Sequence, residues 1–210
     1  MMSFCRAVSV VPAPCAAGRD LARIVQINEE IKAIVALAFK INIMALNAIF
    51  LAKRAGSTAL GFSVLSNELR VFSQDLKSAM AGLSGLIHQA VADVSVLLQD
   101  QRLVRLLEAA EMHSGGNERV REALRARQEK MQNHGAALAR QRRQLQLVLA
   151  NVAQLVELGG VLAKSAKIEA AYGQSFAPAL AQVSGEFDGV VEAIRHSLGL
   201  LHKSEFFAQR

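Results

Sequence analysis

The chain has 210 residues, 52% of them hydrophobic, which is enough apolar side chain for a sizeable core and argues against disorder throughout. Three prolines, no tryptophan and no run of alternating β-branched residues favour helix almost everywhere, so the predicted fold class is all-α. The formal net charge of +6 is local, because the basic excess lies between Asn117 and Gln144.

The first segment, residues 1–19, is predicted to be a disordered N-terminal tail. Its short apolar run is broken by Pro12 and Pro14, which makes it a weak match to a secretory signal. Cys5 and Cys15 lack the CxxC spacing of zinc and disulfide motifs, and two isolated thiols fit a reducing compartment. We therefore expect a cytoplasmic protein.

The next stretch, residues 33–56, is apolar enough to raise the question of a membrane span. Within residues 34–52 only Lys40, Asn42 and Asn47 interrupt the apolar run. A span would place Lys40 near the bilayer centre, at a cost of about 2.5 to 3.5 kcal/mol on insertion scales. A helix buried in a bundle explains the same composition without that cost, and we expect it instead of a span.

Apolar residues along the chain repeat every 3.5 positions, the spacing of coiled coils. In the second helix one heptad position is filled by Phe62, Leu69, Leu76, Leu83, Ala90, Leu97 and Val104. Turn signals interrupt the pattern three times, at residues 55–61, 113–117 and 172–178. Four helices are therefore predicted, near residues 20–55, 60–113, 117–172 and 177–207.

These lengths predict two helical hairpins, residues 20–113 and 117–210, folded onto each other at Gly115 and Gly116. The expected architecture is long antiparallel coiled-coil hairpins that form a four-helix bundle within one chain. The two inner helices should overhang the outer ones by about 20 residues, or roughly 30 Å at the helical rise. This overhang contains the basic segment and is expected to be a two-helix stalk.

An internal repeat supports the two hairpins. A shift of 118 residues places one set of small and polar residues on another of the same kind. The matches are Ala45 with Ala163, Ala48 with Ala166, Ala52 with Ala170, Ser57 with Ser175, Ser66 with Ser184 and Glu68 with Glu186.

The stretch AFKINIMALNAIFLAKRAGSTALGFSVLSNELRVFS, Ala38 to Ser73, resembles the hairpin tip of the signalling domain of methyl-accepting chemotaxis proteins. The resemblance extends upstream through INEEIKAIVALAFK, and a weaker echo lies in IEAAYGQSFAPALAQVSGEF of the more degenerate second hairpin. The residues that carry it are Ala45-Leu46-Asn47-Ala48, Arg54-Ala55-Gly56, Gly61-Phe62, Val64, Glu68 and Arg70.

The resemblance implies a soluble chemoreceptor-like signal transduction protein that acts through contacts of its hairpin tip. Its implied partners are a chemotaxis histidine kinase and its coupling protein, or receptor tips, together with self-association. The implied tip turn contains Gly56 and Gly61. The implied partner-binding residues are Phe39, Ile43, Leu46, Asn47, Arg54, Phe62 and Val64.

The tip also departs from the family pattern. Leu51, Ser57 and Leu60 stand where the family has charged residues, and Lys164 and Tyr172 replace a leucine and an arginine in the second copy. The loss of three charges removes ion pairs that would fix the choice of partner, and it leaves a more apolar tip.

Two alternatives need no link to the chemotaxis kinase. The basic stalk, with Arg140, Arg142 and Arg143, could bind nucleic acid or an anionic membrane, although no aromatic residue is interleaved there. The chain could also be a helical scaffold. No catalytic set, cofactor motif or pair of histidines at metal-binding spacing is found, so we expect neither an enzyme, nor a cofactor, nor a metal site.

Overall fold

The computed structural model describes residues 16–113, 115 and 117–204, and this part of the chain is all-α, which confirms the predicted fold class. Its long helices are α1 (Ala16–Ala55), α2 (Leu60–His113), α3 (Glu118–Ala170) and α4 (Ala177–His202). Two short 3₁₀ turns, η1 (Gly56–Ala59) and η2 (Gln174–Phe176), join α1 to α2 and α3 to α4.

The helix boundaries agree with the heptad analysis except at the outer ends. Residues 16–19 belong to α1, so the prediction that they are disordered is wrong. The rest of the predicted tail, residues 1–15, lies outside the described residues. At the other end α4 stops at His202, whereas a helix to residue 207 was predicted; residues 205–207 lie outside the described residues. Leu201 is the last buried residue of α4, and the chain leaves the helix at Lys203.

Residues with special conformations make the turns. Gly56 (φ 69°) and Gly115 (φ 62°) adopt the left-handed conformation that glycine reaches without steric cost. Asn117 then caps α3, because its side-chain oxygen accepts a hydrogen bond from the Arg119 backbone N–H at 3.0 Å. The middle turn, which the sequence predicts at residues 113–117, therefore consists of a left-handed glycine followed by an N-cap.

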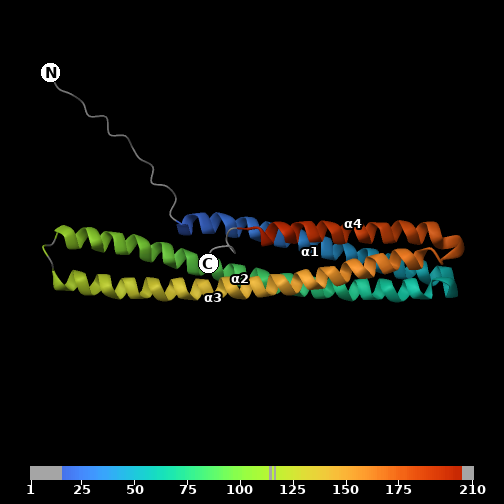
Figure 1. The fold of residues 1–210 in the computed structure, drawn as a ribbon, viewed down its shortest axis with the longest axis horizontal. Coiled ribbons are helices and arrows are strands. Elements are labelled where there is room, and N and C mark those ends of the chain that lie inside the picture. The colour runs from blue at the N-terminus through green and yellow to red at the C-terminus, as the bar shows by residue number, and fades with distance from the viewer. Residues whose placement is uncertain (1–15, 114, 116, 205–210) are drawn as a thin grey trace, which may run out of the picture.

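The four helices form a helical bundle in which chain neighbours lie antiparallel (Figure 1). α1 contacts α2 and α4, and α3 contacts α2 and α4. The end of the bundle that carries η1 and η2 is called the tip. At the opposite end α2 and α3 continue beyond α1 and α4 as a pair, and residues 100–113 and 118–134 of this pair are called the stalk.

The core near the tip combines small and large side chains. Buried alanines line the inner faces of α1 and α3, while Phe62 of α2 and Phe187 of α4 are fully buried between the helices. Two buried serines satisfy their hydroxyls within their own helices, since Ser66 donates to the Phe62 carbonyl and Ser184 to the Ala181 carbonyl. These serines are partners in the 118-residue repeat.

Phe72 of α2 packs directly on Gly159 of α3. A Cβ atom at Gly159 would lie only 2.5 to 2.9 Å from three atoms of the Phe72 ring, which is itself buried. The close approach of α2 and α3 at this level therefore depends on a residue without a side chain.

Gly159→Ala should lower the free energy of unfolding by about 1–3 kcal/mol, because the buried ring has to move away from the new methyl group. Gly82→Ala is the matched control: a Cβ there meets nothing within 4 Å, and the better helix propensity of alanine should stabilise the chain by up to about 1 kcal/mol. Urea denaturation followed by circular dichroism measures both; a Gly159→Ala variant as stable as the control would contradict the packing argument.

An ion-pair group links α3 to α4. Arg195 lies across Gly160 and donates from Nε to Glu157 Oε1 (3.0 Å) and from Nη2 to Glu157 Oε2 (3.2 Å), and it also pairs with Glu192. The hydrogen bond from Arg195, reinforced by its charge, holds the pKa of Glu157 below its ordinary value.

A carboxyl whose pKa is lowered by folding stabilises the folded chain above its unfolded pKa, and this contribution disappears as pH falls through the folded pKa. The difference in Tm between the unmodified chain and Glu157→Gln should therefore be present near neutral pH, begin to shrink near the ordinary glutamate pKa of about 4.3, and disappear as pH falls through the lower folded pKa. Thermal melts from pH 7 to pH 3 test this. Glu68→Gln, which removes an exposed carboxyl from α2, should show no such loss, and a constant difference for Glu157→Gln would contradict the assignment.

Candidate functional site

The structure places most of the predicted partner-binding residues on the outside of the tip half of the bundle. Phe39 is 59% exposed, and Ile43, Asn47, Arg54 and Val64 are also exposed. Leu46 is half-buried. The residues on α1 therefore form a surface that a partner can reach, and Val64 adds an exposed apolar side chain on the neighbouring helix.

Phe62 is the exception, and the prediction that its side chain binds a partner is wrong. It is 0% exposed, packed in the core between the helices, so its side chain is not available to a partner. The reason was visible in the sequence, since Phe62 occupies the same heptad position as Leu69, Leu76 and Leu83, all of which are fully buried.

Four of the exposed or half-buried apolar residues on α1 form a continuous line, called the outer stripe: Phe39, Ile43, Leu46 and Phe50. Their spacing of four, three and four residues puts them on one face of the helix, outside the face that carries the core seam. Sequence reasoning missed Phe50, although its position three turns after Phe39 continues the same pattern.

The charges that border the outer stripe on its own helix are all positive. Between Ile31 and Ala55 the charged residues are Lys32, Lys40, Lys53 and Arg54, and no acidic residue occurs. Such an excess of one sign biases the surface toward a partner of opposite charge.

The second hairpin does not repeat this apolar line. Under the 118-residue shift Ile43 and Phe50 correspond to Val161 and Ile168, both exposed, but Phe39 corresponds to Glu157 and Leu46 to Lys164. Polar residues therefore interrupt the equivalent face of α3. Of the two repeats, only the first carries the outer stripe, on α1.

The two predicted turn glycines have different roles. Gly56 provides the left-handed residue that ends α1. Gly61 lies under the side chain of Glu169 from α3, and a Cβ atom there would come within 2.1 Å of Glu169 Oε1. Gly61 thus allows the first tip turn to pack against the end of α3.

A groove between α1 and α2 opens next to the outer stripe, with a cavity volume of about 520 Å³. Its floor contains Ile31 and Met80, which are buried. Its walls include Val35, Ala36 and Phe39 of α1 and Ala81 of α2, and Lys32 and Lys77 lie at its edge. Phe39 belongs to both features, so this α1–α2 groove and the outer stripe form one continuous surface.

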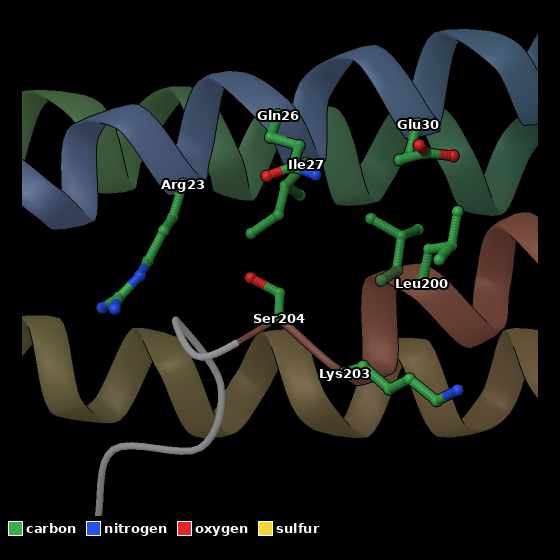
Figure 2. A pocket seen from close by; sticks show the side chains of 8 residues that line it. Arg23, Gln26, Ile27, Glu30, Leu200, Lys203 and Ser204 are labelled. Carbon is green, nitrogen blue, oxygen red and sulfur yellow. The ribbon is translucent and has the colours of Figure 1, made fainter.

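A smaller cavity of about 290 Å³ lies where α4 ends (Figure 2). Arg23, Gln26, Ile27 and Glu30 enter it from α1, and Leu200, Leu201, Lys203 and Ser204 from the end of α4. Its edge mixes Arg23 and Lys203 with Glu30, so it does not favour a ligand of either charge.

The basic segment is partly neutralised within the molecule. Arg121 pairs with Glu111 and Glu118 at 3.5 Å, and Arg127 pairs with Asp100. Arg140 and Arg143 are exposed, whereas Arg142 is half-buried. The side chain of Gln141 lies 3.4 Å from Gln89 of α2, so this arginine cluster sits closer to the middle of the molecule than to the end of the stalk.

A buried charge cluster at the base of the stalk was not found from the sequence. Asp100 of α2 is only 3% exposed; its Oδ1 accepts a hydrogen bond from Arg127 Nη1 and its Oδ2 from His134 Nδ1, both at 2.9 Å. Both donors come from α3, seven residues apart. The cluster therefore ties α2 to α3 where α1 and α4 no longer cover them.

Two stretches of the described chain, Ala22–His113 and Glu118–Ala170, contain windows apolar enough to cross a membrane by length and composition alone. Core helices of bundles pass the same test, so the expectation of a buried helix stays a prediction. Among the described residues no group of three or more His, Cys, Asp or Glu side chains is placed to hold a metal ion.

Comparison of the chain with protein-family models, with curated proteins and with solved structures finds no match.

Removing either side of the Asp100 cluster should have unequal effects. Arg127→Met leaves a buried carboxylate with one donor fewer and should destabilise the chain by about 1–3 kcal/mol. Asp100→Leu removes the buried charge, and Arg127, 32% exposed, can then turn to water, so the loss should be smaller. Urea denaturation at pH 7 tests the order, and a greater loss for Asp100→Leu would contradict it.

Proposed function

We propose that this chain is a chemoreceptor-like signal transduction protein that acts by binding other proteins through the outer stripe and the tip, rather than by catalysis. The proposed partners are chemosensory proteins, namely a histidine kinase and its coupling protein, or receptor tips. The observation that carries the proposal is the outer stripe: α1 presents apolar residues outward although its inner face already supplies a complete core seam.

The energetics favour a partner on this surface. Fully burying a side chain such as Phe or Ile contributes roughly 1.5–3 kcal/mol, and Phe39, Ile43 and Phe50 remain exposed in the isolated chain. A small number of adjacent apolar side chains is enough to form the centre of a protein interface when polar residues surround it. Asn47 and Arg54 provide such a polar edge.

The proposed contact differs from that of the family it resembles. Ser57 and Leu60, exposed at the tip, and Leu51, half-buried, replace charged residues of the family pattern. Partner choice would then depend less on ion pairs and more on apolar contact with the outer stripe, with Lys53 and Arg54 as the charges that α1 keeps close to the turn.

Ile43→Asp should weaken binding to a purified coupling protein or kinase at least tenfold, because a carboxylate would be buried in an apolar interface. Val71→Asp is the matched control: Val71 of α2 is 42% exposed, against 41% for Ile43, but lies outside the stripe. Asn47→Ala and Arg54→Ala should each weaken binding as well. Surface plasmon resonance measures these affinities, and circular dichroism checks that each variant is folded.

An affinity that stays unchanged in Ile43→Asp, Asn47→Ala and Arg54→Ala would reject the proposed surface. Replacing Arg140 and Arg143 by Gln tests the alternative in which the basic segment binds nucleic acid or an anionic membrane. That change should leave protein binding unchanged; binding to DNA or anionic vesicles that falls steeply with salt and disappears in this variant would instead identify this arginine cluster as the functional surface.

A further inference from the structure

We propose that the α1–α2 groove, together with the outer stripe, binds an acidic amphipathic helix of a partner protein. This partner class rests on the proposed function, since the groove opens onto the outer stripe through Phe39. It adds a binding site that lies farther from the tip turn than Asn47 and Arg54, and it names the chemistry of the partner.

The shape of the groove suits side chains that project from a helix. Ile31 and Met80 provide an apolar floor, and the walls stay low because Ala36 and Ala81 carry only methyl groups. A cavity of about 520 Å³ is within the range of roughly 300–1,000 Å³ that is typical of binding pockets. Grooves of this kind between two helices accept the apolar face of a third helix.

The length of the surface favours a helix over a small ligand. From Ile31 in the groove to Phe50 at the end of the stripe, α1 covers about 28 Å at the helical rise. The four, three, four spacing of Phe39, Ile43, Leu46 and Phe50 matches the heptad repeat by which two helices interlock their side chains. The occupant is therefore a helix of about five turns with apolar residues at heptad spacing.

The charges select an acidic helix. Lys32 on α1 and Lys77 on α2 lie at the edge of the groove, and Lys40, Lys53 and Arg54 continue the positive border along α1. Lys32 is held by Glu29 at 2.7 Å, and Lys77 is exposed. A second copy of this chain would bring the same basic border against itself, so the surface fits a different, acidic partner.

The test uses the full chain and a defined probe. The probe is a fluorescent three-heptad peptide with leucine at positions a and d and glutamate at e and g; a matched peptide carries lysine at e and g. Fluorescence anisotropy should show binding of the acidic peptide that weakens with salt, and binding of the basic peptide at least tenfold weaker.

Two pairs of variants locate the peptide. Ala81→Leu fills the groove from an exposed position and should weaken binding about tenfold, whereas Ala92→Leu, an exposed alanine of α2 outside the groove, should not. Lys77→Glu should weaken binding of the acidic peptide and strengthen that of the basic one. Its control is Lys164→Glu, which changes an exposed lysine on α3 and should leave both affinities unaltered.

Equal binding of both peptides, no binding of the acidic peptide, or full binding by Ala81→Leu would each overturn the proposal. None of these outcomes affects the proposed function, which depends on Ile43, Asn47 and Arg54 and is tested with chemosensory proteins. Conversely, loss of the coupling-protein contact with the peptide result intact would reject the function and leave the acidic-helix site standing.

Discussion

The contact between α2 and α3 is the constraint on which the rest of the structure depends, because these are the two helices that run the whole length of the molecule. Where they are joined by α1 and α4, each has an additional heptad position whose residues are buried: Met80, Ile87 and Val94 on α2, and Leu149, Val156 and Ala163 on α3. In the stalk the same positions become polar, with Gln101 and Glu108 on α2 and Arg121 and Gln128 on α3. The sequence thus specifies four helices at one end and two at the other.

The Asp100 cluster lies at this transition. A slip of one heptad between α2 and α3 would leave the buried carboxylate beside only one of its two donors, Arg127 or His134, because these donors are seven residues apart. Apolar contacts such as Val104 with its neighbours tolerate such a slip more easily, because one aliphatic side chain replaces another. The polar layer therefore opposes alternative pairings in the part of the molecule that has the least apolar surface to define its register.

Much of this architecture could be predicted from residue spacing, and the failures have physical reasons. Heptad positions and glycine turns are local signals, and they predicted the four helices to within a few residues except at the outer ends. The resemblance at the tip predicts Phe62 as a partner-binding residue, but its heptad position places it in the core seam, where it is fully buried. The α1–α2 groove and the Asp100 cluster depend on which residues of two distant segments face each other, and a single helix pattern does not contain that information.

The length of α2 has a mechanical consequence. Its 54 residues correspond to a rod of about 80 Å, braced by α3 along its length. The tip and the Gly115 turn are therefore separated by more than the diameter of a small domain, which is about 30 Å. The packing of α2 against α3 along this length sets how stiffly that separation is kept.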